Sequence, residues 1–385
     1  MIEKVTIKNY KSIRELTDFE LNPINILIGA NNSGKSNFLD VFSFLRDTLL
    51  DENLQNERGV KIAGLQGVLQ KRGGGESICF HGEQFFQIGC LGSPFSYLLE
   101  VGKKQPNRYY RICDEKLSLT NAEKKFFDLE NGTVVLYNED GINWSSKGPS
   151  NGGTGLGCLL RHDRADRHAS DFAKRLSEMR IYDRIHTEMW SPIRAPKVSK
   201  GETILDEDGG NLVGVLHQLS QVQPKFLSEL NSLLKILFRD FARISFPSNE
   251  RGEILIRWED ANGQIANTAQ LSDGTLKFLC LIAILKNPNL PALIGIDEVD
   301  ANLHPKMQVI LAGMFEEAAL HTQIIATTHN PDFVSMFGPD EIVILQQHKG
   351  ETEMRRFSTK GALELWLKHF TTRKLWLMGE LESRW

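Results

Sequence analysis

The sequence predicts an α/β fold of the phosphate-loop nucleotide-binding class, built on a mostly parallel sheet. Three features predict it: a glycine-rich loop from Gly29 to Ser36 between a β-type run and a helical pattern, an apolar run ending in Asp297 and Glu298, and a β-rich run ending in His329. Parallel strands present their carboxyl ends at one edge of a sheet. We therefore expect these distant segments to form one site.

The loop Gly29-Ala30-Asn31-Asn32-Ser33-Gly34-Lys35-Ser36 has the spacing G-x-x-x-x-G-K-S. A glycine-rich turn lets successive backbone N–H groups converge on a triphosphate at a helix N-terminus. Lys35 is expected on the β- and γ-phosphates and the Ser36 hydroxyl on Mg²⁺. The nucleotide-binding residues predicted from this stretch are Gly29, Asn31, Asn32, Ser33, Gly34, Lys35, Ser36 and Asn37.

Composition restricts the alternatives. The chain has 385 residues, a formal net charge of −4 and a pI near 6.2, so its overall charge does not attract nucleic acid. The five cysteines form no C-x-x-C pair, which argues against disulfides and a zinc site. No apolar run reaches the length of a membrane span and no signal peptide is evident, so we expect a cytoplasmic protein without membrane contact.

Between the two halves of the predicted site, the chain reads as a β-rich part followed by a helical part. Residues 78–144 contain short aromatic and β-branched runs separated by turn residues, typical of an antiparallel meander, and residues 147–155 resemble a linker. Further along we expect a helix at 169–181, a strand at 188–194, two amphipathic helices within 211–241 interrupted near Pro224, and a hairpin at 253–263.

The basic clusters of the sequence are ambiguous. Lys11 and Arg14 are as consistent with contact to a phosphate or base as with a solvated turn. The pair Lys71 and Arg72 begins a glycine-rich break, and for it we favour a solvated surface, as we do for the clusters at 161–164 and 194–197.

The second half of the predicted site lies late in the chain. Leu271-Ser272-Asp273-Gly274-Thr275 opens an apolar helix, with Ser272 or Asp273 as its cap. The apolar run 293–298 ends in two acidic residues. At this strand end we expect Asp297 to bind the metal and Glu298 to polarise the attacking water. A lone histidine such as His329 is more often structural, but here it is the third strand end expected at the same edge.

Order and spacing resemble the ABC-type ATPase heads of the SMC/RecF group, and most of all the stand-alone predicted AAA-family ATPases related to OLD-type proteins but lacking a nuclease domain. The resemblance covers the whole chain. The matching segments are the opening strand at 7–12, Walker A at 29–36, a RecF-like segment at 205–212, the signature at 271–277, Walker B at 297–298, the D-loop at 300–305 and the switch-histidine loop at 327–331.

The resemblance implies a P-loop NTPase fold, with an ABC-ATPase head, an antiparallel β-rich insertion and a helical signature lobe. It implies that residues 1–385 form a single head: a Walker A portion at 1–75, a β-rich lobe at 76–146, a helical and signature portion at 165–290, and a portion with Walker B, D-loop and switch histidine at 291–385. A Q-loop glutamine stays unassigned, because Gln66 and Gln70 do not follow a clear strand.

The resemblance also implies a mechanism. Two heads face each other, and Ser272 and Gly274 of one head bind the γ-phosphate of the ATP held by Lys35 of the other, so that ATP joins a homodimer or a higher oligomer. Glu298, His329 and Lys35 are the implied catalytic residues, Ser36 and Asp297 the Mg²⁺ ligands, and Asp273 must point away from the triphosphate or be paired.

Two functions from different classes fit this sequence. The first is a dimerising ATPase coupled to DNA repair or anti-phage defence through a separate nuclease or other effector protein, with DNA as a candidate partner. The second is a nucleotide-bound scaffold that assembles or restrains a toxin or nuclease with little turnover. A transporter subunit is disfavoured by the insertion. A AAA+ motor or a GTPase is disfavoured because Asp297 lies so far from Lys35 and no N-K-x-D follows.

Overall fold

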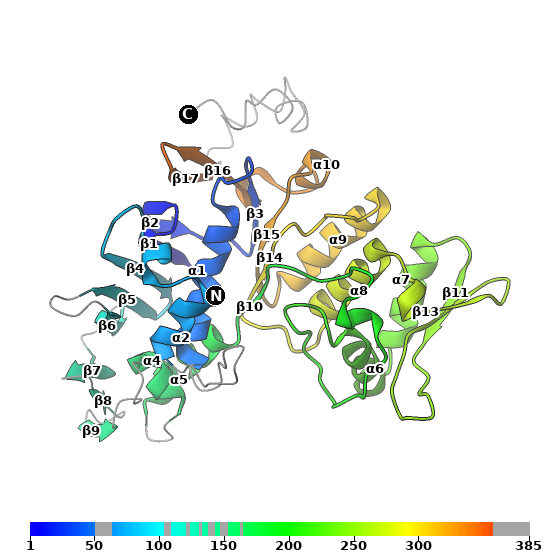
Figure 1. Cartoon of the computed structure of the whole chain (residues 1–385), viewed down its shortest axis with the longest axis horizontal. Helices are drawn as coiled ribbons and strands as arrows, with labels where there is room; N and C mark the ends of the chain where they lie inside the picture. Colours follow the sequence, from blue (N-terminus) through cyan, green and yellow to red (C-terminus); the bar gives the residue numbers. More distant parts are fainter. Residues whose placement is uncertain are drawn as a thin grey trace.

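Two sheets enclose helix α1 (Lys35–Leu50) in the half of the molecule that holds the N-terminus (Figure 1). The computed structural model describes residues 1–50, 64–103, 109–120, 124–130, 133–137, 143–146, 153–161 and 165–356. The central sheet is parallel except for its last strand, and its order is β10 (Arg180–Tyr182), β14 (Leu293–Ile296), β15 (Gln323–Thr327), β3 (Ile24–Ile28), β16 (Ile342–His348) and β17 (Glu351–Arg356).

The second sheet is antiparallel and combines strands from two parts of the sequence. Its order is β2 (Ile13–Glu20), β1 (Lys4–Tyr10), β4 (Phe85–Gly92), β5 (Phe95–Lys103) and β6 (Tyr110–Leu119). A small sheet follows, made of β7 (Phe127–Glu130), β8 (Thr133–Tyr137) and β9 (Asn143–Ser146). The predicted antiparallel meander is therefore present, and its first strand pairs with β1, so that it extends the sheet begun by the N-terminus.

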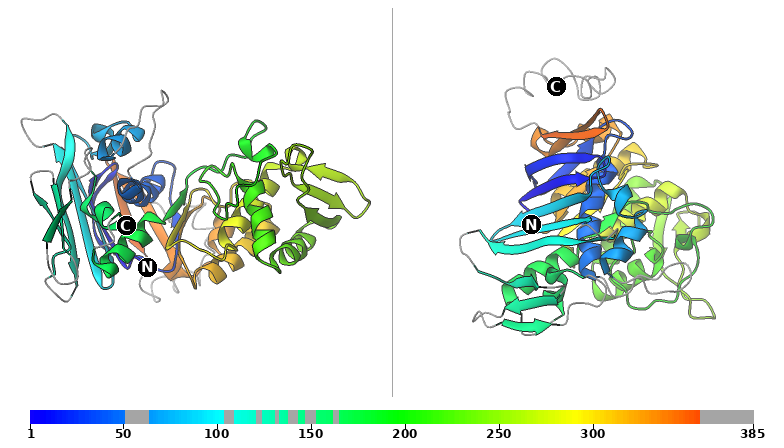
Figure 2. Two further views of the ribbon diagram at one scale, coloured as in Figure 1. Left: turned by 90° about the horizontal axis from the view of Figure 1, so that it is seen from below. Right: turned by 60° about the vertical axis from the view of Figure 1, so that its left-hand side comes forward.

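The layers follow from which faces are apolar. Strands β3, β14 and β15 are buried at every residue, as expected for parallel strands covered on both faces. One hydrophobic core fills the space between the two sheets around α1, where Phe38 and Phe42 are fully buried. The second core lies on the other face of the central sheet. It is covered by α6 (Leu212–Val222), α8 (Asp273–Leu285) and α9 (Pro305–Ala318), and the left view of Figure 2 shows this succession of layers.

The helical half carries the signature segment. Its two amphipathic helices are α6 and α7 (Phe226–Leu237), and the break at Pro224 lies between them as predicted. A three-stranded sheet of β11 (Phe241–Ser245), β12 (Arg257–Asp260) and β13 (Ile265–Asn267) extends from this half (Figure 1). The remaining helices are α2 (Gly64–Lys71), α3 (Gly75–Ile78), α4 (Gly155–Leu160), α5 (Arg167–Ser177) and α10 (Pro331–Val334).

Two local predictions were wrong. The helix expected at 169–181 ends at Ser177, and the next residues form the short strand β10 at the edge of the central sheet. The strand expected at 188–194 is a turn followed by the 3-10 helix η1 (Pro192–Arg194). The Ser191 side chain accepts a hydrogen bond from the Ile193 N–H, and Pro192 begins this short helix because its φ angle suits a helical turn. Most of the predicted linker and the C-terminal residues 357–385 lie outside the described residues.

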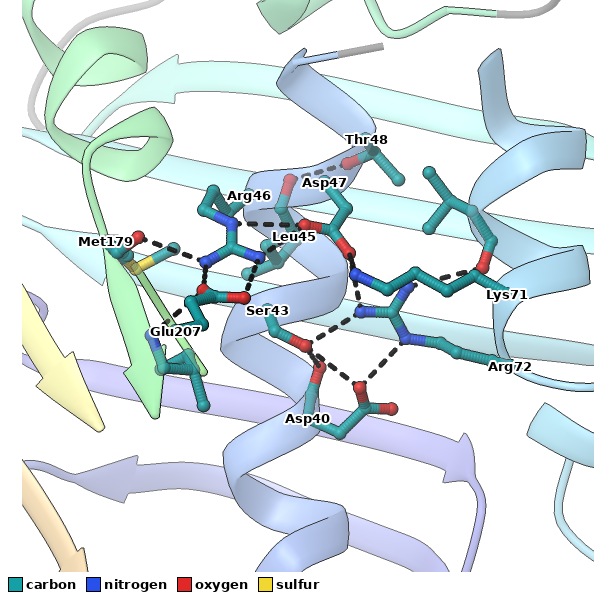
Figure 3. Close-up of polar contacts among 12 residues, drawn as sticks. Asp40, Ser43, Leu45, Arg46, Asp47, Thr48, Lys71, Arg72, Met179 and Glu207 are labelled. Carbon is teal, nitrogen blue, oxygen red and sulfur yellow. Dashed lines mark hydrogen bonds and ion pairs between the residues drawn. The ribbon is translucent and has the colours of Figure 1, made fainter. Parts of the chain in front are cut away.

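Arg72 corrects the interpretation of the Lys71–Arg72 pair as solvated surface. Its guanidinium is buried against α1 and bonds to the carboxylates of Asp40 and Asp47, each at 2.9 Å. Asp47 also pairs with Arg46, and Arg46 reaches Glu207 in the segment that leads to α6 (Figure 3). A chain of alternating charges therefore connects α2, α1 and the entry to the helical half.

Candidate active site

The phosphate loop connects β3 to α1 in a conformation that its glycines permit. Gly29 and Gly34 have φ angles of 152° and 101°, and Asn32 adopts a φ of 68°. A Cβ on Gly29 would lie 2.2 Å from the Leu345 carbonyl oxygen, and one on Gly34 would lie 2.2 Å from the Thr352 hydroxyl. Because β16 and β17 approach the loop this closely, only glycine fits at either position.

Lys35 lies folded into its own loop. Its ammonium donates to the carbonyl oxygens of Gly29 and Ala30, both at 2.8 Å, and the side chain is almost fully buried. These carbonyl groups satisfy the charge where a triphosphate would otherwise do so. The loop therefore holds the Lys35 ammonium with carbonyl oxygens of its own backbone.

Ser36 and Asp297 meet across the carboxyl edge of the sheet. The Ser36 hydroxyl donates to the Asp297 carboxylate at 2.6 Å, and Thr327 Oγ1 donates to the other oxygen of that carboxylate. Asp297 follows β14 and Thr327 ends β15, so three chain segments converge here as the sequence predicted. A hydroxyl and a carboxylate form a hard-oxygen donor pair that suits Mg²⁺, which keeps several water and phosphate ligands. This pair fits the predicted metal.

Glu298 is exposed beside Asp297 and has an uncommon backbone conformation. Its φ is 46°, and its N–H donates to Thr327 Oγ1 at 2.7 Å. Thr327 therefore bonds to both members of the acidic pair, Asp297 and Glu298. The same backbone is held from the other side by Lys277, whose ammonium lies 2.6 Å from the Glu298 carbonyl oxygen. These contacts hold the backbone of Glu298 from two sides, and its side chain is exposed.

His329 lies in the loop between β15 and α10, close enough to the other groups for their charges to act on it. Partial burial lowers the pKa of the His329 imidazole, and the positive charge of Lys35 lowers it further, against the carboxylates of Glu298, Asp300 and Asp297. Both effects favour the neutral form of the imidazole. The structure brings His329, Lys35 and the acidic pair together, as predicted.

The signature segment lies in the helical half, at the start of α8. Ser272 is the N-cap of that helix, and its side chain accepts from the Thr275 N–H at 3.2 Å. A Cβ on Gly274 would lie 2.3 Å from the Asn302 carbonyl oxygen, so the signature turn packs directly on the D-loop. A cavity of about 620 Å³ opens here. Ser272 and Gly274 line it with His304 and Lys306, and no phosphate-loop residue does.

Asp273 is paired, which meets the condition that the sequence set for it. Its carboxylate lies 2.6 Å from the Arg194 guanidinium, which is itself almost buried. The interpretation of the 194–197 cluster as solvated surface is therefore wrong for Arg194. In the N-terminal half, Lys11 and Arg14 are also paired. Lys11 lies 2.6 Å from Asp40, and Arg14 lies 3.9 Å from Glu351.

Sequence reasoning missed three contributors to this edge. Asp183 follows β10, which lies beside β14 with Tyr182 opposite Ile296, so Asp183 leaves the sheet next to Asp297. Thr327 and Lys277 position the acidic pair, as described above. The β-type triplet Arg180-Ile181-Tyr182 was the available signal for Asp183. Gln66, one of the two glutamines considered for the Q-loop, lies on α2 and donates to the Tyr110 carbonyl oxygen.

Comparison with known proteins assigns most of the chain to one family. A family described as "AAA domain, putative AbiEii toxin, Type IV TA system" matches residues 24–335. The "Retron Ec83 probable ATPase" of Escherichia coli is 29% identical over 120 residues, which are 28% of this chain and 22% of that protein, so the match spans about a fifth of the relative's length.

The fold has a counterpart among solved structures. An SMC head determined in complex with the C-winged helix domain of ScpA superposes with a TM-score of 0.54 at 12% identity, covering 94% of this chain and 99% of that one. This similarity confirms the predicted fold class: a P-loop head of the SMC type with an antiparallel sheet and a helical lobe. Within the described residues, no helix combines the length and the apolar character that a membrane crossing requires.

Proposed function

Because this chain belongs to the family described as "AAA domain, putative AbiEii toxin, Type IV TA system", and is thus an ATPase of the AAA/SMC-head type, we propose that it hydrolyses ATP between two associated heads. The observation that carries this proposal is the contact of 2.6 Å between Ser36 and Asp297, with Glu298, His329 and Lys35 around it. A metal ligand pair, a base and a phosphate-binding cation then share one open edge.

In this proposal the phosphate loop binds the nucleotide. The N–H groups between Gly29 and Ser36 and the start of α1 are placed for the phosphates, and Lys35 exchanges its two carbonyl partners for phosphate oxygens. Asn31 and Asn32 are exposed on the same loop. Ser36 and Asp297 would hold Mg²⁺, which when bound neutralises charge that develops on the phosphates.

Hydrolysis is assigned to Glu298 and His329. The exposed carboxylate of Glu298 orients the attacking water and accepts its proton, from a backbone fixed by Thr327 and Lys277. The His329 imidazole, whose pKa is lowered by burial and by the charge of Lys35, donates a hydrogen bond to the γ-phosphate. Electrostatic positioning of this kind supplies most of the rate enhancement in phosphoryl transfer, where the protein performs little covalent chemistry.

The separation of the signature from the phosphate loop within one head supports a dimer. Ser272 and Gly274 line a cavity that no phosphate-loop residue lines, and the N-terminus of α8, which has thirteen residues, is there to receive an anion. We assign the γ-phosphate of the opposite head's ATP to this position. ATP then joins two copies of the chain, and turnover requires their association.

The decisive experiment is light scattering of Glu298→Gln with and without Mg·ATP. This substitution removes the base and keeps the shape, so the closed state should accumulate and the mass should double with ATP. Adding Ser272→Arg places a cation and extra bulk in the signature turn and should return the mass to that of the monomer. A doubled mass that persists in the Ser272→Arg variant would refute association through the signature.

The biological setting that we propose is a DNA transaction in repair or anti-phage defence, carried out through a partner effector. Three similarities support it: the resemblance to the SMC/RecF group, a family description that names a toxin and a toxin–antitoxin system, and the partial match to a retron ATPase. A scaffold with little turnover uses the same site. The intact Glu298 disfavours it, and an ATPase rate unchanged by Glu298→Gln would favour it.

A further inference from the structure

A nearly fully exposed tryptophan lies close to the signature segment. Trp190 is 94% exposed and its neighbour Met189 is 70% exposed, in a fold that buries most of its other large apolar side chains. Solvation of such an indole is unfavourable, and exposed aromatic residues framed by polar ones mark contact surfaces. Glu188 and Pro192 are exposed as well, whereas Ser191 between Trp190 and Pro192 is buried.

The turn that carries Trp190 is rigid. The Ser191 N–H donates to the Glu188 carbonyl oxygen at 2.9 Å, and the Ser191 hydroxyl donates to the His186 carbonyl oxygen at 2.7 Å. Directly after the turn, Ile193 is fully buried in the core of the helical half. The tip is therefore presented by a fixed scaffold, so its side chains lose little conformational entropy when they are covered.

Arg194 fastens this turn to the signature. Its Nε donates to the carbonyl oxygens of Thr187 and Glu188, at 2.9 and 3.2 Å. Its two Nη atoms reach the Leu271 carbonyl oxygen at 2.7 Å and the Asp273 carboxylate at 2.6 Å. Since one guanidinium spans both sides, the Glu188 carbonyl and the Asp273 carboxylate lie within about 8 Å of each other. The turn that carries Trp190 is therefore attached to the signature segment through Arg194.

We propose that Trp190 and Met189 pack against a second copy of this chain when two heads close around ATP, and so form an apolar anchor of the dimer beside the signature. The inference rests on the proposed function, which places the opposite head at Ser272. Tryptophan is enriched among the few interface residues that carry most of the binding energy, and a polar rim improves its exclusion of water. The charged residues near it in the sequence are Asp183, Arg184, Glu188 and Arg194, two of each sign, so they provide no positive excess that would favour a nucleic-acid backbone.

The test compares dimer dissociation constants in Mg·ATP, measured by light scattering and sedimentation in the Glu298→Gln background. Adding Trp190→Ala should raise the constant at least tenfold, and Trp190→Phe should raise it less. Leu320→Ala is the matched control, because Leu320 is 75% exposed just before β15 and hence at the opposite edge of the sheet. Binding of a fluorescent ATP analogue to the Ser272→Arg monomer should be unchanged by Trp190→Ala.

The outcomes separate the two proposals. If Glu298→Gln dimerises with ATP and Trp190→Ala leaves the constant unchanged, the anchor is refuted and the paired-head ATPase stands. If Trp190→Ala weakens a labelled oligonucleotide complex and not the dimer, the exposed indole serves nucleic acid and the anchor is again refuted. If Glu298→Gln stays monomeric in ATP, both proposals fail.

Discussion

The Lys277 ammonium donates a hydrogen bond of 2.6 Å to the backbone carbonyl oxygen of Glu298. Lys277 lies on α8, the helix that begins at the signature, and Glu298 is the proposed base, held at a φ of 46°. Burial lowers the pKa of the Lys277 ammonium, against the neighbouring carboxylates of Asp300 and Glu298. The signature helix and the proposed base are thus joined by one buried contact within the same head.

Lys277→Met should therefore separate catalysis from binding. The side chain keeps its approximate volume and loses its donor, so the Glu298 backbone can relax from its uncommon conformation. We expect kcat to fall about tenfold or more, by loss of an interaction worth at least about 1.4 kcal/mol in the transition state, with little change in ATP affinity. Steady-state kinetics with an independent ATP-binding measurement would check this.

Lys286→Met is the control for that experiment. Lys286 caps the other end of α8 and pairs with Glu317 at the surface. Its loss should leave kcat within twofold of the wild type, because an exposed ion pair contributes little. An equal loss of kcat in both variants would show that Lys277 acts only through the stability of α8.

Arg72 should be a major contributor to stability. Burial favours protonation of Asp40, but the charges of Arg72 and Lys11 outweigh it and lower the pKa of Asp40 to about 2. Arg72→Met leaves Asp40 and Asp47 without this buried partner, and we expect the free energy of unfolding to fall by about 3–5 kcal/mol. Urea denaturation of Lys71→Met, whose half-exposed ammonium lies 3.5 Å from Asp47, is the control and should show a change within about 0.5 kcal/mol.

Glu115 should make stability depend on pH. Burial raises the pKa of this carboxyl from 4.5 to about 7, against hydrogen bonds from the N–H groups of Gly155 and Leu156 and from Tyr97. Because the folded pKa lies above the unfolded one, this contribution is complete below pH 4.5 and is lost as pH rises through 7.

Between pH 5 and 8 the wild type should lose about 1–3 kcal/mol of stability from Glu115. Glu115→Gln cannot ionise, so its unfolding free energy should depend less on pH over this range. Parallel pH slopes for the two proteins, measured by urea denaturation, would contradict a titrating Glu115.

The sequence predicted the parts of the site that are encoded locally. Gly29, Lys35 and Ser36 are spaced by the loop itself, and Asp297 and His329 follow apolar runs whose parallel pairing places their ends at one edge. The positions of such residues depend on neighbours in sequence, so a single chain is enough to predict them. The fold class followed from the same strand-and-edge logic and was confirmed by the SMC head.

The missed features depend on contacts between distant residues. Arg72 is buried because Asp40 and Asp47 face it from α1, a charge complement that no local pattern reports. The strand β10 has only three residues, too few to show a period, and its place beside β14 is decided by pairing. The segment 188–194 resembles a strand because it contains large apolar residues, but two of them, Met189 and Trp190, are exposed on a turn.

Gly274→Ala should disable association. The added Cβ would meet the Asn302 carbonyl oxygen at 2.3 Å, and because this is backbone, the signature turn and the D-loop must move apart. We expect the ATP-dependent mass of the Glu298→Gln protein to return to that of the monomer.

Gly313→Ala is the matched control. Gly313 lies in the interior of α9, and a Cβ there meets nothing within 4 Å. Removal of this glycine should raise the unfolding free energy by about 0.5–1 kcal/mol, because alanine is the better helix former, and should leave the dimer intact. If Gly274→Ala dimerises as well as Gly313→Ala does, the close packing of the signature on the D-loop is not required for two heads to meet.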